Sequence, residues 1–375
     1  MARIKTRTVF LLQTAAVAAL LLAPVIAAAA DSTEKAAYGG STLSPDKDAA
    51  GDSLWSRYNY AGLRALNKAD YKRAEFDFNL ALIEAQKSGK EDVPLAATLN
   101  NIAELRRYQG QYKEAEKLYK QALAIKERLL GEESLAAANS MNNLAVLYTT
   151  MANYPEAEKF YKRSIAIREK VLGKDDLNIA SSLVNMGAFY DDEHKYAEAE
   201  TCYKRALKIR ESALGSSSSE TAYVLHDLGV LALHQEKLDE AEDYLKRALA
   251  IDEHALGLDH PQTATIQSAL GSCYLAENKV EQADSLLHKA LLTHQRALSF
   301  EHPEVACDLF NIGLVSEKRG KYKDAERMFK SSMTIRKKLL GPKHPETVAA
   351  CDAYNRVLKL SAKESGQKES SAHPD

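Results

Sequence analysis

The sequence predicts an all-α solenoid of seven helix pairs followed by one C-terminal capping helix. The first observation behind this prediction is a repeating Ala that is followed each time by an acid. Each unit also contains two runs in which apolar residues recur three and four positions apart, as on one face of a helix. A fixed period of this kind is typical of proteins whose units bury their apolar faces against their neighbours. The spacing of the Ala is 41 residues once and then 42 residues five times, at Ala74, Ala115, Ala157, Ala199, Ala241, Ala283 and Ala325.

The composition is that of a folded, mildly acidic chain. It has 375 residues, of which 45% are hydrophobic and 27% are charged, and its formal net charge is −2. Residues 1–30 carry Arg3, Lys5 and Arg7 and no acid, so the remainder carries −2 − 3 = −5. Because binding to a phosphate backbone needs clustered Lys and Arg, this charge argues against nucleic acid as a partner.

Residues 1–30 have the three-part pattern of a secretory signal peptide. A basic start precedes a stretch from Val9 to Ile26 that is apolar apart from Gln13 and Thr14, and Ala27–Ala30 supplies small residues for cleavage before Asp31. We therefore expect an exported protein, periplasmic or secreted, with the bacterial periplasm favoured and an endoplasmic lumen as the other possibility. The alternative is an uncleaved membrane anchor, because Val9–Ala30 approaches the length needed to span a bilayer. After cleavage no membrane insertion is expected.

The rest of the chain divides into a linker, the repeats and a tail. Residues 31–52 are rich in Ala, Ser, Gly and Asp and predict a flexible linker, whereas residues 361–375 predict a disordered tail. Residues 53–360 hold the repeats, and the incomplete last unit, Glu346–Leu360, is expected to be the capping helix. We expect the four Cys residues to be small buried side chains, with a disulfide as the less favoured alternative. They are Cys202, Cys273, Cys307 and Cys351.

Small residues at one position of each first helix predict close packing of the two helices in a unit. A bulky residue of the second helix is expected to fill the notch that the small residue leaves. The small residues are Gly62, Ala103, Ala145, Gly187, Gly229, Gly271 and Gly313. The bulky residues are Phe78, Tyr119, Tyr161, Tyr203, Leu245, Leu287 and Phe329.

This pattern resembles the tetratricopeptide repeat, in the 42-residue form of the kinesin light chain-like subfamily. The resemblance rests on Asn100-Asn101 and Asn142-Asn143 early in the first helices, and on Leu-Gly endings such as Leu130-Gly131 and Leu172-Gly173. It covers residues 53–360. It implies a tetratricopeptide-type right-handed superhelical solenoid whose first helices line a concave groove that binds extended protein segments.

The resemblance also implies which side chains line this groove. On a helix with about 100° per residue, Asn142 and Asn143 lie opposite the packing residues Met141 and Leu144. The groove residues expected on this basis are Asn100, Asn101, Asn142, Asn143, Val184, Asn185, His226, Leu233, Phe310 and Asn311. One alternative is that the Asn side chains bridge adjacent first helices. A second is that the apolar residues of this row cover one another.

No motif in the sequence indicates catalysis, a cofactor or a metal site. The pairs His260-Pro261, His302-Pro303 and His344-Pro345 recur once per unit, too far apart for one metal ion, and Pro suits the first turn of a helix. The repeating acids fit the starts of exposed helices. We therefore expect a protein-binding scaffold or assembly factor, not an enzyme. The alternatives are an enzyme or small-molecule binder with a site across several units, and a structural component that self-associates.

The signal peptide prediction has a direct test. The mature protein should begin at Asp31, because the small residues Ala28 and Ala30 fit the cleavage site of a signal peptidase. Intact-mass measurement on the exported fraction would check this. A species that retains Met1 and sediments with membranes would instead support the anchor.

Overall fold

The computed structural model describes the backbone of residues 53–371 and the side chains of residues 53–363. Within this range the chain forms fifteen α-helices and no strand, as predicted for an all-α repeat fold. The predicted signal peptide and linker lie outside the described residues. None of the described helices is both long and apolar enough to cross a membrane.

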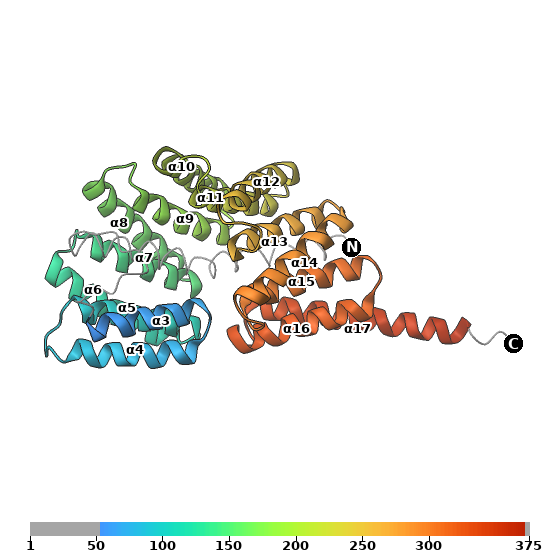
Figure 1. Ribbon diagram of the computed structural model, residues 1–375, viewed down its shortest axis with the longest axis horizontal. Helices are drawn as coiled ribbons and strands as arrows, with labels where there is room; N and C mark the ends of the chain where they lie inside the picture. Colours follow the sequence, from blue (N-terminus) through green and yellow to red (C-terminus); the bar gives the residue numbers. More distant parts are fainter. Residues whose placement is uncertain (1–52, 372–375) are drawn as a thin grey trace. The chain divides into compact units, whose positions relative to one another are not determined.

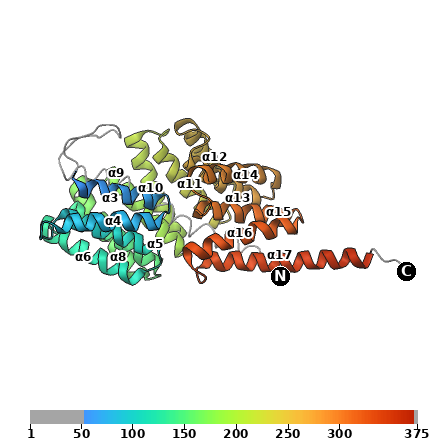
Figure 2. The same ribbon diagram turned by 60° about the horizontal axis from the view of Figure 1, so that its bottom comes forward.

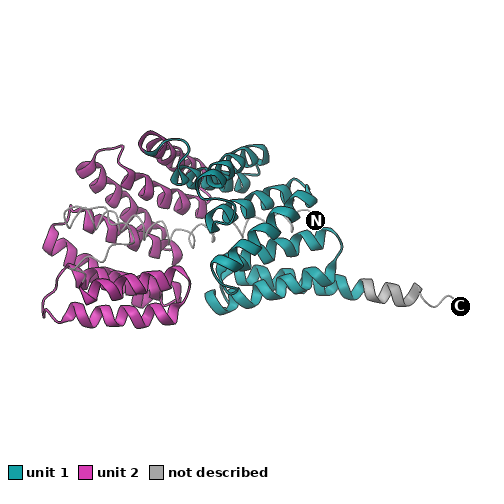
Figure 3. Cartoon of the chain, viewed as in Figure 1, with its two compact units in different colours: residues 1–20, 214–375 teal, residues 21–213 magenta. Residues whose placement is uncertain are grey.

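The described helices fall into two compact units, residues 53–213 and residues 214–371 (Figure 3). The first unit contains α3 (Leu54–Asn67), α4 (Tyr71–Gln86), α5 (Val93–Tyr108), α6 (Tyr112–Leu130), α7 (Leu135–Thr150), α8 (Tyr154–Leu172), α9 (Leu177–Asp192) and α10 (Tyr196–Leu214). The second contains α11 (Ser219–His234), α12 (Leu238–Ala255), α13 (Pro261–Ala276), α14 (Val280–Ala297), α15 (Pro303–Lys318), α16 (Tyr322–Leu340) and α17 (Pro345–Ser371).

Consecutive helices form antiparallel pairs, and each pair is one repeat of the sequence (Figure 1). The odd-numbered helix of a pair also contacts the odd-numbered helix of the next pair, as α7 does with α9 and α13 with α15. The odd-numbered helices therefore form an inner layer that is buried on most sides. The even-numbered helices contribute one buried stripe each and leave the opposite side exposed.

A side-chain cap fixes the start of each odd-numbered helix from α3 to α15. The cap accepts a hydrogen bond from a backbone N–H two or three residues further on, which satisfies a donor that has no partner inside the helix. In α13 and α15 the cap is His260 or His302, whose Nδ1 accepts from the N–H of Gln262 or Glu304 at 3.2 Å. The expected structural role of these His-Pro pairs is confirmed. The caps are Ser53, Asp92, Ser134, Asp176, Ser218, His260 and His302.

The predicted notch packing joins the two helices of each pair. A Cβ atom placed on Gly187 would lie 2.7 Å from the ring of Tyr203, and one on Gly313 would lie 2.6 Å from the ring of Phe329. All seven bulky residues of this row are buried. Because these contacts leave no room for a further methyl group, the small residue sets the distance between the two helices.

The four Cys residues are unpaired in the described structure. Cys202 and Cys273 are buried, as expected for small apolar side chains, whereas Cys307 and Cys351 are half-buried. Burial raises the pKa of the Cys202 thiol to about 11, so this thiol is protonated and poorly reactive near neutral pH.

The capping helix is longer than predicted. α17 packs on α16 and buries Ala350, Ala353 and Val357, but it continues to Ser371 and not to the predicted end at Leu360 (Figure 2). Residues 361–371, which were expected to belong to the tail, are therefore helical in the structure. The segment contains Ala, Lys, Glu and Gln, which have high helix propensity, and a preformed turn makes each added residue less costly to order.

Removal of α17 should loosen the array from its end. In a chain that stops at residue 344, we expect α15 and α16 to lose protection from hydrogen exchange first, while α11 and α12 stay protected, because each pair contacts only its neighbours. A chain that stops at residue 363 keeps the packed part of α17 and serves as the control. Equal loss of protection throughout residues 214–344 would instead indicate one cooperative core.

Candidate protein-binding face and buried polar network

A ladder of Asn side chains joins neighbouring inner helices in the unit formed by residues 53–213. Asn101 Nδ2 donates to Asn59 Oδ1 at 2.8 Å, and Asn143 Nδ2 donates to Asn100 Oδ1 at 2.9 Å. The third rung, from Asn185 Nδ2 to Asn142 Oδ1, measures 3.3 Å. Bridging between adjacent first helices, one of the two roles expected for these Asn residues, is therefore present.

The ladder leaves part of each amide unused. An Asn side chain has two N–H donors and a carbonyl acceptor, and each rung uses one donor of one residue and the acceptor of the other. Asn100, Asn101 and Asn143 are half-buried, whereas Asn142 and Asn185 are buried. Val184 stands at the next acceptor position and has no polar side-chain atom, so the ladder does not extend through it. Peptide binding by these Asn residues stays a prediction.

The expectation that an apolar row lies open in the groove is wrong. Phe310 is fully buried, and its ring centroid lies 5.0 Å from that of Phe329 on the second helix of the same pair. Leu233 belongs to the same hydrophobic core, and Val184 is 2% exposed. Phe310 and Leu233 lie in one buried hydrophobic cluster, so these side chains are covered within the fold and are not open to a partner.

Two polar residues of the expected groove are also engaged within the fold. His226 is buried, and its Nδ1 lies 3.1 Å from Asp227 Oδ1. Asn311 is buried and donates from Nδ2 to Ser272 Oγ at 3.0 Å. Neither side chain presents an open contact surface.

The structure reveals a row of buried polar residues that we did not predict, at one position of the outer helices. A polar or charged residue is buried there in six successive pairs, although such residues are costly to bury without partners. The residues are Lys126, Arg168, Arg210, Asp252, His294 and Arg336. Their spacing of 42 residues is visible in the sequence, so the repeat itself carried the signal.

Arg168 shows how this position connects consecutive repeats. Its Nη2 donates to Asn139 Oδ1 on α7, the inner helix of its own pair, and its Nη1 donates to the Asn178 carbonyl at 2.7 Å, at the start of α9. Burial lowers the pKa of Arg168 to about 10. The negative charge of Asp176 raises this pKa, but by less than burial lowers it. The guanidinium thus acts as a clamp between the two helices.

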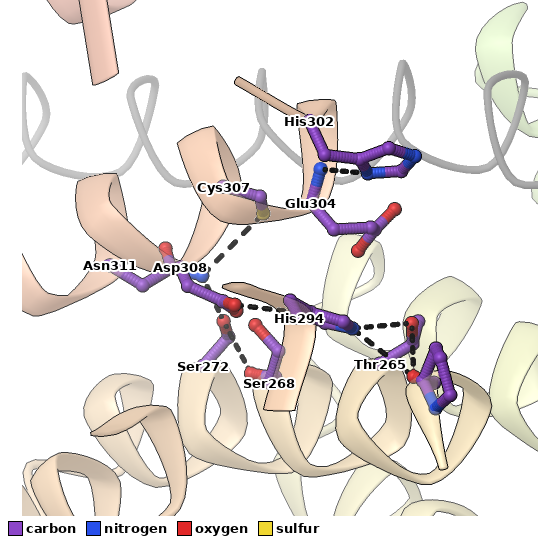
Figure 4. A network of polar contacts seen from close by, with 10 residues as sticks. Thr265, Ser268, Ser272, His294, His302, Glu304, Cys307, Asp308 and Asn311 are labelled. Carbon is purple, nitrogen blue, oxygen red and sulfur yellow. Dashed lines mark hydrogen bonds and ion pairs between the residues drawn. The ribbon is translucent and has the colours of Figure 1, made fainter. Parts of the chain in front are cut away.

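His294 makes the equivalent connection with an ion pair. Its Nδ1 lies 2.7 Å from Asp308 Oδ2 on α15, and its Nε2 lies 3.1 Å from the Pro261 carbonyl on α13. Both side chains of the pair are fully buried. Burial opposes the charged form, but the carboxylate of Asp308 raises the pKa of His294 to about 9. The imidazolium therefore donates from both ring nitrogens (Figure 4).

Arg336 repeats the arrangement at the capping helix. Its Nη1 donates to the Glu346 carbonyl at 3.2 Å, and its Nε lies 3.4 Å from Glu346 Oε2. The guanidinium carbon lies 5.1 Å from the centre of the Phe310 ring. The pair thus fixes the start of α17 against α16.

Glu304, at the start of α15, differs from these paired groups. It is 4% exposed, and its backbone N–H donates to His302 Nδ1 at 3.2 Å. Burial raises the pKa of Glu304 to about 7. The positive charge of His294 lowers this pKa, and the negative charge of Asp308 raises it further. Burial and the charge of His294 lower the pKa of the adjacent His302 to about 4, so His302 is neutral near pH 7.

These groups do not form a metal site. Within residues 53–363 no group of three or more His, Cys, Asp or Glu side chains is placed to hold a metal ion. The polar network of Figure 4 is therefore a set of ion pairs and hydrogen bonds between helices.

A comparison with protein families identifies the repeats. The tetratricopeptide repeat model matches residues 94–170, 178–254, 228–291 and 262–338, well over half of the chain. The chain therefore belongs to the tetratricopeptide repeat family. The 42-residue helix pairs are consistent with the kinesin light chain-like form of the repeat. No curated protein matches the sequence.

Several solved structures are similar to this chain at low sequence identity. A tetratricopeptide repeat protein from Parabacteroides merdae is 17% identical, with a TM-score of 0.51 over 82% of this chain and 99% of that one. BtubC (BKLC) from P. vanneervenii is 22% identical, with a TM-score of 0.48 over 65% of this chain and 92% of that one. Putative kinesin light chain repeats from Podosopora anserina are 21% identical, with a TM-score of 0.44 over 55% and 98%. The Parabacteroides merdae protein therefore shares the helical repeat fold of this chain.

The buried His294–Asp308 pair should make stability depend on pH. Because the pKa of His294 is about 9 in the folded chain and about 6.5 when unfolded, its contribution is fully present below pH 6.5 and is lost as the pH rises through 9. The difference in unfolding free energy between wild type and His294→Gln should therefore shrink between pH 6.5 and 9. Urea unfolding at several pH values measures it.

The control for this experiment is His288→Gln, which changes an exposed His on the same helix, α14. Its difference from wild type should be small, because the side chain is exposed. A constant difference for His294→Gln would contradict a charged His294 in the folded state.

Proposed function

We propose that this chain is an exported protein-binding scaffold or assembly factor that holds extended partner segments along its inner helices. Family membership supports a role in protein–protein interaction. The observation that carries the finer proposal is the Asn ladder, because it presents half-buried amides at regular intervals on consecutive inner helices. The spare N–H and carbonyl of Asn143 can pair with the backbone of a bound segment.

The contacts that hold neighbouring helices together within each unit support this mechanism. Notch contacts fix the two helices of each pair, and Arg168, His294 and Arg336 fix consecutive pairs to each other. A face that is already formed loses little conformational freedom on binding, so less of the contact energy is spent on ordering. The affinity then depends mainly on the contacts that the bound segment makes and on the cost of ordering that segment.

Export is part of the proposal and rests on the sequence of residues 1–30. A cleaved signal peptide would leave the repeats in the periplasm, with secretion or an endoplasmic lumen as the alternatives. Partners are proteins or peptides, and nucleic acid is not expected. Self-association through the ends of the array is the competing structural role.

Site-specific photocrosslinking tests the binding face. A photoreactive residue at Asn143, on the inner layer, should crosslink a partner protein in the exporting cell, whereas the same residue at Ala166, on the exposed side of α8, should not. Circular dichroism should first show that both variants keep their helices. Crosslinks from Ala166 alone would place the site on the outer layer, and crosslinks to a second copy of the chain would favour self-association.

A further inference from the structure

The outer side of α4 carries large apolar side chains that the repeat does not require. Phe76, Leu80 and Ile83 follow one another at four and three positions, so they form a stripe on one side of the helix, opposite the buried Ala74 and Ala81. Phe76 and Ile83 are each 55% exposed, and Leu80 is half-buried. The other outer helices have a polar or charged residue at the position of Phe76. These residues are Lys117, Lys159, Thr201, Asp243, Ser285 and Arg327.

Basic residues lie at both ends of this apolar stripe. Lys72 and Arg73 precede it at the start of α4, Lys87 follows it at the end, and all three are exposed. Arg73 is paired with Asp77 at 2.7 Å, and Lys87 is paired with Glu84 at 2.7 Å. Exposed ion pairs of this kind are weak, so these cations can also contact the acids of another segment. The outer side of α4 therefore suits a segment whose apolar residues have acids on either side.

The chain that leads into α3 has this pattern. In residues 31–52 the two largest apolar side chains are Tyr38 and Leu43. Acids lie on both sides of them and outnumber the two Lys residues, so the segment has a net negative charge. The acids are Asp31, Glu34, Asp46, Asp48 and Asp52.

The order of these residues matches the order along α4. Because α3 and α4 are antiparallel, Ser53 lies at the end of α4 that carries Lys87 (Figure 1). A segment that runs back from Ser53 along α4 brings its last three acids to Lys87, then Leu43 and Tyr38 to the apolar stripe, and its first two acids to the basic start of the helix. Residues 31–52 reach about 70 Å when extended, whereas the 16 residues of α4 are about 24 Å long, so the segment is long enough.

We propose that residues 31–52 bind the outer side of α4, with Tyr38 and Leu43 on the apolar stripe and acidic residues at its two basic ends. Because the segment is tethered beside its site, its effective concentration is on the order of millimolar, and a weak contact suffices to hold it. A second copy of the chain fits less well, since antiparallel pairing of two α4 helices would place Lys87 of one beside Lys72 of the other. The inference is independent of the proposed function, because the stripe faces away from the inner helices.

Photocrosslinking within the chain tests this contact. p-Benzoylphenylalanine in place of Phe76 keeps an aromatic ring at this position. In dilute purified protein that includes residues 31–52, it should crosslink to the tryptic peptide of residues 36–47, which contains Tyr38 and Leu43. The same photoreactive residue in place of Lys159, the equivalent exposed position of α8, should give at least about tenfold fewer crosslinks to that peptide, because the segment is not held there.

Two pairs of variants test the apolar and the charged contacts separately. Tyr38→Ser with Leu43→Ser should lower the crosslink yield from position 76 at least about fivefold, because the burial of two large side chains is lost. Lys72→Glu with Lys87→Glu should lower it at least about threefold, since these changes replace attraction by repulsion. Lys159→Glu with Lys170→Glu, an equal change of net charge on α8, should leave the yield unchanged.

The other occupants of the stripe are separate outcomes. Crosslinks from position 76 that join two copies would assign the stripe to a second copy, and crosslinks to lipid in the exporting cell would assign it to a membrane surface. Either result overturns the proposal, as does a yield that Tyr38→Ser with Leu43→Ser leaves unchanged. Circular dichroism checks that each variant keeps its helices. Crosslinking from Asn143 reports on the proposed function and does not depend on this result.

Discussion

The close approach of two helices around a small residue is the contact on which the whole array depends. Where Gly187 meets Tyr203 and Gly313 meets Phe329, there is no space for one added carbon atom. This contact fixes how the two helices of a pair cross, and it therefore also fixes which side of each inner helix is left to meet the next pair. The regular period of the sequence is the consequence, because every pair must present the same surface to its neighbour.

Between helix pairs, polar contacts specify the register in which one pair packs on the next. Apolar side chains alone would specify this register less strictly. The Asn ladder and the clamps at Arg168 and Arg336 are hydrogen bonds and ion pairs between particular donors and acceptors. An Asn or Arg shifted away from its partner would leave a buried donor unpaired. A wrong register would therefore add the cost of unpaired buried groups to the cost of a poor hydrophobic fit. Buried polar groups in this chain are best understood as devices that hold helices in register.

The sequence predicted the fold well because its strongest signals are local and repeated. Helix pairs, notch residues and the role of the His-Pro caps follow from periodicity and from the chemistry of helix ends. Phe310 was misplaced because a helical wheel assumes that one side of a helix is packed and the other open. An inner helix has neighbours on several sides, so the wheel cannot tell a second packing face from a binding face.

Other parts of the site needed the structure for a different reason. Arg168 and His294 share a repeat position that the sequence displays, but neither their burial nor the partner of each can be read from spacing alone. Asn143 was assigned two roles, and the sequence could not decide between them because both need the same side chain on the same face. The raised pKa of Glu304 depends on its burial and on the charges of His294 and Asp308, and these are properties of the assembled network.

The chemical differences between the clamps also determine how the array can evolve. Asp252 and His294 occupy the same position in consecutive repeats. A recombination that removed one 42-residue unit between them would bring Asp252 to the place where His294 now faces Asp308, and two carboxylates would meet in a buried site. These two repeats therefore share one shape without being interchangeable, because the charge at this position differs between them.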